Sequence, residues 1–186
     1  MIRLIVGLGN PGLQYKKTRH NAGFLFLDCL ANACGVNVWA LNRQFNAEVV
    51  SIDWGGERIV LMKPQTFMNA SGFSVQKAAN FYKLAPEEIL VIHDELELSE
   101  GEARLKVGGG HGGHNGIRDI SAKIGSANFY RIRVGIARPN YGSVSDYVLS
   151  KPDENGEKLM ISLFEKIQLN LDQIINKKLS ELIIRI

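Results

Sequence analysis

The chain begins with an apolar run, residues 2–8, in which Arg3 is the one charged residue, and the run stops at a turn-forming segment, residues 9–12 (GNPG). A short apolar run closed by glycine and proline is typical of a buried strand that runs into a turn. Such a strand has no polar face, so other elements of the chain must cover it. The kind and order of those elements therefore decide the fold.

Strand-like and helix-like segments alternate through the rest of the chain. Residues 22–34 carry apolar side chains at helical spacing, and Gly35 is expected to end that helix. Further helices are predicted at residues 115–124, at residues 153–176, and from a cap at Asn69 or Ser71 to about residue 83. Further strands are predicted at residues 47–53, 58–63, 89–93, 103–107 and 131–137, the first two forming a hairpin. This alternation predicts an α/β fold, with residues 1–186 forming a single domain whose mixed β-sheet is flanked by helices.

Composition excludes several classes of protein. Hydrophobic residues make up 45% and charged residues 22% of the chain, which is normal for a globular protein and argues against disorder. No apolar stretch approaches the roughly 20 residues needed to cross a bilayer, and the first one is too short for a signal peptide. The two cysteines, Cys29 and Cys34, are expected to be free thiols. We therefore expect a cytoplasmic protein without a membrane partner, and the net charge of +3 permits a nucleic-acid partner without requiring one.

Polar side chains able to exchange protons or hydrogen bonds recur just after the predicted strands. They are Asn10, Asn69, Asp94, His114 and Asn115. In open α/β sheets the loops beyond the carboxyl ends of the strands converge on a ligand-binding crevice. Each residue taken alone is a common turn or cap residue, but their shared placement predicts one cleft. His20 follows the first of these turns and is expected to join them.

The combination of His20 with Asp94 points to general-base chemistry. A neutral imidazole is the usual base near neutral pH, and a carboxylate on its other nitrogen fixes the tautomer and stabilises the cation. Glu95 and Glu97 are rival carboxylates, because strand alternation leaves their orientation open. The chain has no G-x-S-x-G nucleophile elbow, and Ser71 lacks the required flanking residues. A histidine–aspartate pair without a placed nucleophile indicates attack by activated water.

Two other kinds of site are suggested by motifs but are not favoured. Residues 7–12 fit the dinucleotide fingerprint G-x-G-x-x-G after a strand. However, Pro11 lies inside that loop, and residues 15–20 delay the helix that should hold the pyrophosphate. His93 and Asp94, with His111 and His114, suggest a zinc site, but a catalytic site needs three ligands of matching geometry and the chain has no H-E-x-x-H spacing. We therefore expect no metal and no cofactor.

Five sequence blocks carry a family resemblance. They stand at residues 4–12 (LIVGLGNPG), 18–23 (TRHNAG), 64–69 (PQTFMN), 93–95 (HDE) and 108–116 (GGGHGGHNG). In their order and spacing, over almost the whole chain, these blocks resemble the bacterial peptidyl-tRNA hydrolases. The resemblance implies a monomeric single-domain enzyme that hydrolyses the ester joining a peptide to the ribose of tRNA. Its partner is then peptidyl-tRNA that has left the ribosome prematurely, contacted at its acceptor end and along its peptide.

The resemblance also implies roles for individual residues. His20 is the general base and Asp94 its orienting partner, while Asn10 is similar to the residue linked to telling blocked from free aminoacyl groups. The other residues implied to line the cleft and bind substrate are Tyr15, Phe67, Met68, Asn69, His114 and Asn115. Asparagine amides suit this task, because they can hold a peptide backbone or stabilise an oxyanion without titrating.

Basic residues on two predicted strands are candidates for contacting the RNA. Lys106 and Arg133 match the family's clamp for the 5′ phosphate of tRNA, and Arg104 and Arg131 lie nearby; alternatively, all four are solvated strand charges. Phosphate contacts would give salt-sensitive affinity without base readout. The segment 138–147 has no lysine, whereas many relatives carry one in this loop, so tRNA affinity is where this chain is expected to differ.

Several alternatives remain open at this stage. A binding module that shares the fold without catalysis has no need of both His20 and Asp94, and a metallohydrolase would be stopped by a chelator. The glycine-rich run 108–113 either lets a ligand approach the backbone closely or is a flexible loop. Residues 179–186, five of them apolar, either extend the last helix or pack elsewhere.

Overall fold

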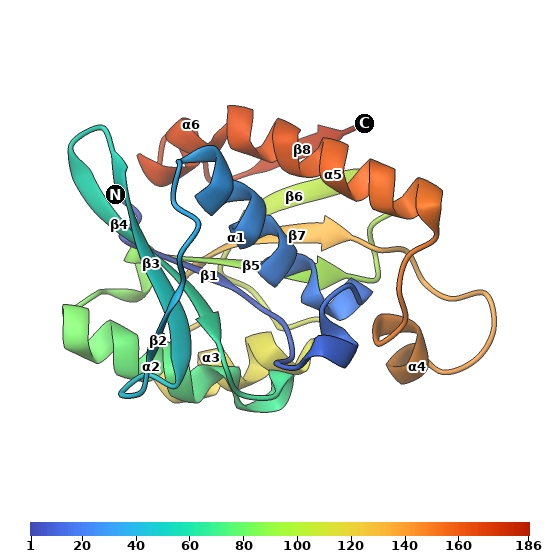
Figure 1. Cartoon of the computed structure of the whole chain (residues 1–186), viewed down its shortest axis with the longest axis horizontal. Coiled ribbons are helices and arrows are strands. Elements are labelled where there is room, and N and C mark those ends of the chain that lie inside the picture. The colour runs from blue at the N-terminus through green and yellow to red at the C-terminus, as the bar shows by residue number, and fades with distance from the viewer.

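The computed structural model describes all residues 1–186, which form an eight-stranded sheet with helices packed on both faces (Figure 1). The strands are β1 (Leu4–Gly7), β2 (Ala40–Asn42), β3 (Ala47–Trp54), β4 (Glu57–Pro64), β5 (Ile89–Glu95), β6 (Glu102–Val107), β7 (Tyr130–Gly135) and β8 (Leu182–Arg185). The α-helices are α1 (Ala22–Ala33), α2 (Ser71–Tyr82), α3 (Asn115–Ile124), α4 (Val144–Val148), α5 (Glu154–Leu169) and α6 (Leu171–Ile175). Four short 3₁₀ helices are η1 (Leu13–Tyr15), η2 (Arg19–Asn21), η3 (Met68–Ala70) and η4 (Pro86–Glu88).

The sheet is mixed. Its strand order is β2-β3-β4-β1-β5-β7-β6-β8, and the four central strands β4, β1, β5 and β7 run parallel. The outer strands β2, β3, β6 and β8 pair antiparallel with their neighbours. Strands β3 and β4 form the predicted hairpin, in which Trp54 pairs with Glu57 across two glycines. The predicted α/β class, with a mixed sheet between helices, is confirmed.

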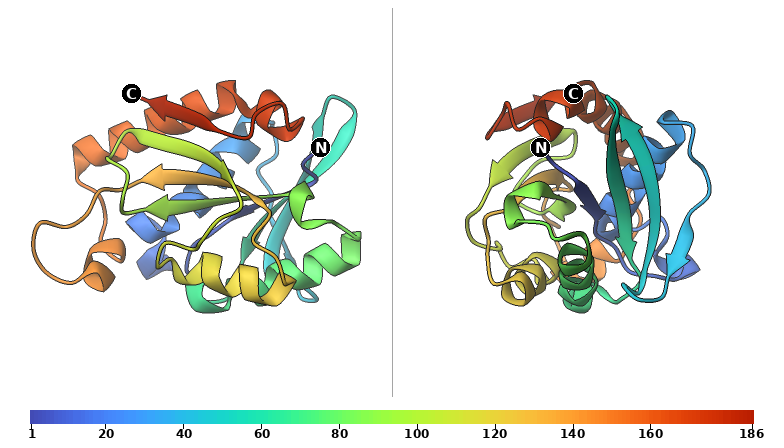
Figure 2. Two further views of the ribbon diagram at one scale, coloured as in Figure 1. Left: turned by 180° about the vertical axis from the view of Figure 1, so that it is seen from behind. Right: turned by 90° about the vertical axis from the view of Figure 1, so that its left-hand side faces the viewer.

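Two hydrophobic layers hold the helices to the sheet (Figure 2). Helices α1, α5 and α6 cover one face, while α2 and α3 cover the other. Successive side chains of a strand point to opposite faces, and β1 shows this directly. Ile5 packs in the layer with α1, whereas Leu4 and Val6 pack in the layer with α2. Burial on both faces explains why the first strand has no polar position.

The first glycine of the apparent dinucleotide fingerprint, Gly7, serves helix packing together with Gly23. A Cβ on Gly7 would lie 2.3 Å from the carbonyl oxygen of Gly23 in α1, and a Cβ on Gly23 would lie 2.2 Å from the backbone nitrogen of Leu8. Only hydrogen fits at either position, so the first turn of α1 rests directly on the backbone of β1. Because η2 precedes α1, the loop after β1 leads into a short helical turn that carries His20.

The predicted helix over residues 153–176 is wrong in one respect, because it is divided at Asn170 into α5 and α6. The side-chain amide of Asn170 donates to the carbonyl of Lys166, which a continuous helix would use for its own backbone bond. The backbone N–H of Asn170 bonds instead to Ile167, one residue nearer. A side chain that competes for a backbone carbonyl is a common way for asparagine to end a helix.

The predicted cap of α2 is also wrong. Neither Asn69 nor Ser71 caps this helix, and the Ser71 hydroxyl donates to the carbonyl of Met68. A carboxylate oxygen of Asp119, on α3, accepts a hydrogen bond of 2.8 Å from the N–H of Gly72. Asp119 therefore caps the N-terminus of α2, although it belongs to another helix.

The remaining elements include some that the sequence did not predict. Strand β2 and helix α4 were not expected from the sequence, and the open question of the C-terminal segment is answered by β8, which pairs with β6 and buries Ile184. The other predicted strands and helices are confirmed within a few residues. Cys29 and Cys34 are half-buried free thiols, as predicted. None of the helices is long and apolar enough to span a membrane.

Candidate active site

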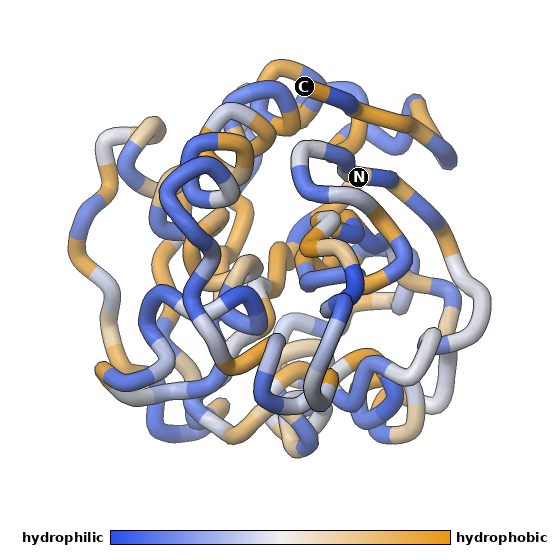
Figure 3. Tube along the Cα trace, turned by 90° about the vertical axis from the view of Figure 1, so that its right-hand side faces the viewer, coloured by the Kyte–Doolittle hydropathy of each residue, from blue (hydrophilic) through white to orange (hydrophobic).

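The carboxyl ends of β1 and β5 open into a pocket of about 460 Å³, which we call the catalytic pocket. Figure 3 views the molecule from this end, where hydrophilic loops surround the apolar interior. The lining includes Asn10, His20, Asp94, Leu96, His114, Asn115 and Val148. Of the residues expected to converge beyond the strands, only Asn69 is absent from this lining.

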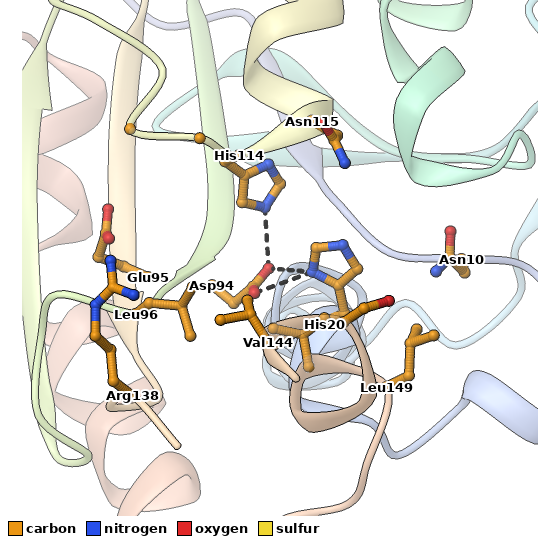
Figure 4. A pocket seen from close by; sticks show the side chains of 14 residues that line it. Asn10, His20, Asp94, Glu95, Leu96, His114, Asn115, Arg138, Val144 and Leu149 are labelled. Carbon is orange, nitrogen blue, oxygen red and sulfur yellow. Dashed lines mark hydrogen bonds and ion pairs between the residues drawn. The ribbon is translucent and has the colours of Figure 1, made fainter. Parts of the chain in front are cut away.

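The imidazole of His20 faces the carboxylate of Asp94 (Figure 4). Nδ1 of His20 lies 2.9 Å and 3.0 Å from the two carboxylate oxygens of Asp94. Asp94 is only 3% exposed at the end of β5, and His20 reaches it from η2. Since the carboxylate accepts, Nδ1 carries the proton and the lone pair of the neutral ring is on Nε2. Nε2 lies on the side of the ring toward Asn10 and Asn115.

A second imidazole, that of His114, shares the same carboxylate. Its Nε2 lies 3.0 Å from the Oδ1 atom of Asp94. Its Nδ1 accepts from the backbone N–H groups of Gly116 and Ile117, at 3.2 Å and 3.3 Å, and so caps the N-terminus of α3. Two N–H donors on Nδ1 require a lone pair there, so the proton of a neutral ring is on Nε2. Asp94 therefore accepts hydrogen bonds from two fixed histidines.

Burial and charge together set the protonation of this cluster. Burial lowers the pKa of His20, but the charge and hydrogen bond of Asp94 outweigh it and raise that pKa above its ordinary value of 6.5. Burial would raise the pKa of Asp94, but the two histidines hold it far below its usual range. Burial, together with the neighbouring His114, lowers the pKa of His93 well below 6.5. At neutral pH the cluster thus contains one firmly ionised carboxylate.

The same three side chains resemble a metal site in outline. One ligand atom each from His20, Asp94 and His114 lies within 4.8 Å of the other two. A metal on Nε2 of His114 would need a lone pair on that nitrogen, whereas a neutral imidazole has only one and Nδ1 already uses it to cap α3. Metal binding would therefore break the cap or ionise the ring. This hydrogen-bond pattern argues against a metal at the cluster.

Neighbouring residues fix Asn10 through its backbone and its side-chain oxygen, and leave its side-chain Nδ2 group without a partner. Its backbone N–H donates to the side-chain oxygen of Asn21 at 2.9 Å, and the Asn21 amide donates back to the Asn10 carbonyl at 3.0 Å. The Asn10 side-chain oxygen accepts from the backbone N–H of Met68 at 2.7 Å. This bond directs the Nδ2 group of Asn10 toward the His20 side of the pocket (Figure 4). Asn21, fully buried in η2, was missed because only spatial contact reveals its role.

The other predicted amides are more exposed. Asn115 lines the catalytic pocket at the start of α3, and its side-chain oxygen accepts from Arg118 at 2.9 Å. Asn69 lies exposed on η3, immediately after the Met68 backbone that contacts Asn10. Asn69 therefore lies outside the lining of the catalytic pocket.

Of the three apolar residues predicted to line the cleft, Tyr15 and Phe67 contact each other near the surface and Met68 is buried. The rings of Tyr15 and Phe67 meet edge to face with their centroids 6.4 Å apart, and Phe67 is 60% exposed. Met68 is buried and packs beneath Gly116, where a Cβ would lie 2.7 Å from the methionine sulfur. None of the three lines the catalytic pocket: Tyr15 and Phe67 form a pair near the surface, and Met68 supports the loop from beneath.

The four basic residues lie on one face of β6 and β7. Arg104 pairs with Arg133, and Lys106 pairs with Arg131, directly across the two strands. Three of the four are engaged within the chain. Arg104 contacts Glu102 at 2.6 Å, Arg133 contacts Glu95 at 2.8 Å, and Arg131 donates to the carbonyls of Gly109 and Gly110. The side chain of Lys106 alone makes no ion pair or hydrogen bond inside the chain.

The lysine-free segment 138–147 forms one wall of the pocket. Arg138 at its start lines the pocket and is ion-paired with Glu97, and α4 adds the apolar side chains of Val144 and Val148. Sequence reasoning identified none of these lining residues, and Leu96 and Leu149 were missed as well. Isolated apolar and basic residues in a loop carry no local signal of this kind.

Comparison with known proteins gives consistent matches. The sequence model of the family described as Peptidyl-tRNA hydrolase matches residues 4–186. The peptidyl-tRNA hydrolase of Methylococcus capsulatus is 48% identical, over 95% of this chain and 98% of that protein, and the one of Geotalea uraniireducens is 51% identical, over 82% and 80%. The crystal structure of peptidyl-tRNA hydrolase from Acinetobacter baumannii is similar with a TM-score of 0.88 and 43% identity, covering 95% of this chain and 90% of that one.

Proposed function

The chain belongs to the peptidyl-tRNA hydrolase family, and from this membership we propose the chemistry of the catalytic pocket. The protein hydrolyses the ester bond between the peptide and the tRNA of peptidyl-tRNA. The substrate is peptidyl-tRNA released prematurely from ribosomes, so that hydrolysis returns the tRNA to use. The contact of His20 Nδ1 with Asp94 at 2.9 Å, which leaves Nε2 toward the pocket, carries the proposed mechanism.

His20 acts as the general base. The lone pair of Nε2 accepts a proton from a water molecule while the water oxygen forms a bond to the ester carbonyl carbon. The tetrahedral intermediate then collapses as the bond to the ribose oxygen breaks. The imidazolium returns its proton to that ribose oxygen, which releases the tRNA and leaves the oxygen of water in the carboxyl group of the peptide.

Asp94 supports both halves of this cycle. Its hydrogen bond to Nδ1 keeps His20 in the tautomer that accepts at Nε2, and its charge stabilises the imidazolium. The bond from His114 holds the carboxylate in place and helps to keep it ionised. The base therefore needs no rearrangement before water attacks.

Asn10 and its neighbouring amides recognise the acyl group. The Nδ2 group of Asn10 is a neutral donor beside His20, suited to a peptide carbonyl or a developing oxyanion. A free α-amino group is charged near neutral pH, whereas an acylated one is a neutral amide. A site that desolvates this position rejects ordinary aminoacyl-tRNA, because burying the cation is costly.

The proposal extends to partner and setting. Lys106 and Arg133 on the strand face of β6 and β7 contact a phosphate of the tRNA, and Asn69, Asn115, Tyr15 and Phe67 contact the peptide end. The chain acts as a monomeric single domain in the cytoplasm, where ribosomes release such substrates.

Hydrolysis in ¹⁸O-labelled water tests the mechanism directly. With an N-acetylated aminoacyl-tRNA as substrate, the label is expected in the released carboxyl group and not in the ribose. Full activity in EDTA is expected, and its loss would instead support the metallohydrolase alternative. No release of the acyl group by the folded protein would support a binding module and overturn the proposal.

A further inference from the structure

A second pocket, of about 560 Å³, adjoins the catalytic pocket and has no part in the chemistry described above. We call it the Trp39 pocket, and its lining includes Pro11, Leu13, Phe24, Trp39, Glu48 and Lys63. The two pockets share one residue, Asn10. The two pockets therefore meet at Asn10.

The ionic groups of the Trp39 pocket neutralise one another. The ammonium of Lys63, whose side chain is only 8% exposed, contacts Asp28 at 2.8 Å and Glu48 at 3.1 Å. It also lies 4.0 Å from the centre of the Trp39 ring. With Lys16 added, the lining holds two cations and two anions. Such a surface offers an RNA phosphate no net attraction.

Two apolar side chains at or beside this pocket are exposed. Leu13 lines it and is 88% exposed. Val38, between two lining residues of the pocket, is 81% exposed. Apolar side chains gathered at the rim of a groove favour a ligand with apolar groups of its own.

The order of strands places the pocket on the side of the catalytic centre away from the basic face. The basic residues stand on β6 and β7, the catalytic residues follow β1 and β5, and the Trp39 pocket draws on β3 and β4. On the basic face, Arg104, Lys106, Arg131 and Arg133 outnumber Glu95 and Glu102. RNA phosphates are attracted to that side, so the other half of the substrate is directed to the opposite side.

We propose that the Trp39 pocket binds the residues of the substrate's peptide that precede the esterified one, chiefly through their apolar side chains. This inference rests on the proposed function, because it assigns a place to one half of the same substrate. The esterified residue lies at Asn10 in the catalytic pocket, and the preceding residues lie against Leu13 and Trp39. Peptides longer than one residue therefore bind more tightly than a single acylated amino acid.

Two substrates on the same tRNA separate the peptide subsite from the catalytic site. One carries N-acetyl-leucine, and the other carries an N-acetylated tetrapeptide of leucine. The variant Leu13→Ser removes an exposed apolar contact that lies outside the catalytic machinery. For this variant we expect KM to rise about tenfold on the tetrapeptide, the low end for an apolar pocket contact, and to stay unchanged on N-acetyl-leucine.

Leu169→Ser is the matched control, because Leu169 is 84% exposed on α5 and lines neither pocket. It should leave both substrates unaffected, and an unchanged melting temperature should show that both variants fold. Trp39→Ala is a second variant, and it should raise KM on the tetrapeptide alone.

Three outcomes would overturn the proposal, and each is distinct. Equal KM values of the Leu13→Ser and wild-type enzymes on the tetrapeptide would show that the Trp39 pocket does not bind the peptide. An equal rise on both substrates would assign the pocket to the RNA end that they share. Failure of the wild-type enzyme to release either acyl group would remove the proposed function itself, and with it this inference.

Discussion

The catalytic pocket and the basic face of β6 and β7 are built in opposite ways. In the pocket, His20, Asp94 and His114 bind one another and present one unused nitrogen to the substrate. On the basic face, the charges that could meet a phosphate are mostly engaged elsewhere, as with Arg133 on Glu95. The pocket is already organised without a ligand, whereas the basic face would have to exchange hydrogen-bond partners in order to bind a phosphate.

This difference separates chemistry from affinity. A preorganised base loses nothing to rearrangement, so removing one member should damage the rate severely. A phosphate that binds Arg133 must compete with Glu95, so only part of the new interaction adds to affinity. We therefore expect large effects on kcat in the pocket and modest, salt-dependent effects on KM at the basic face.

The largest effect should follow from His20→Ala. Loss of a general base typically lowers the rate by about 10²–10⁴-fold, and we expect kcat to fall by that amount with the melting temperature unchanged. His111→Ala is the matched control, because His111 is an exposed histidine outside the pocket lining. Retention of more than about a tenth of the wild-type rate by His20→Ala would contradict general-base catalysis at this residue.

Asp94→Asn should come next, with a loss of at least about 10²-fold in kcat, because the amide stabilises neither the tautomer nor the imidazolium. The pH profile of this variant tests the direction in which Asp94 shifts the pKa of His20. Asp94 raises the pKa of His20, so the acid limb of kcat/KM should lie above pH 6.5 in the wild type, with activity rising as His20 loses its proton. Without the carboxylate, burial dominates and the limb should move to lower pH. A limb that stays in place would show that Asp94 does not act on His20.

His114→Asn should have a smaller effect on kcat and the opposite effect on the pH profile. Asparagine is a good helix cap, so the N-terminus of α3 should remain capped. Asp94 would lose one of its two donors, and its charge would then act more fully on His20. The pKa of His20 should rise further, and the acid limb should move to higher pH. A fall in kcat without this shift would mean that His114 acts on folding alone.

The smallest effects are expected at the basic face. Lys106→Ala should raise KM for full-length peptidyl-tRNA, leave kcat unchanged, and reduce the slope of log KM against log salt by about one. Arg133→Ala should raise KM less, because Glu95 already competes for that guanidinium. An acylated adenosine without the rest of the tRNA is the control substrate, since it offers no phosphate at that distance. A large loss of kcat in Lys106→Ala would break the contrast between the two regions.

Local patterns were sufficient for most of the secondary structure. The apolar run before Gly9 gave β1, the helical spacing of Leu27, Leu30 and Ala31 faces the core as α1, and two glycines after Trp54 formed the hairpin turn. Each of these depends on residues close in sequence, which is where periodicity and turn preferences operate. Two predictions failed where a side chain overrode the local pattern: the continuous helix over residues 153–176 is interrupted at Asn170, and α2 is capped by Asp119 in place of Asn69 or Ser71.

The sequence by itself determined the alternation of strands and helices, and hence that the polar residues after the strands would gather at one end of the sheet. The tertiary structure decided which of them touch. Residues 20 and 94 are separated by 74 positions, and their contact depends on how α1 rests on β1 beside β5. The tautomer of His114, the support of Asn10 by Asn21 and the engagement of Arg133 by Glu95 were settled in the same way. Hydrogen bonds between distant residues form only after packing fixes their geometry, so no local pattern encodes them.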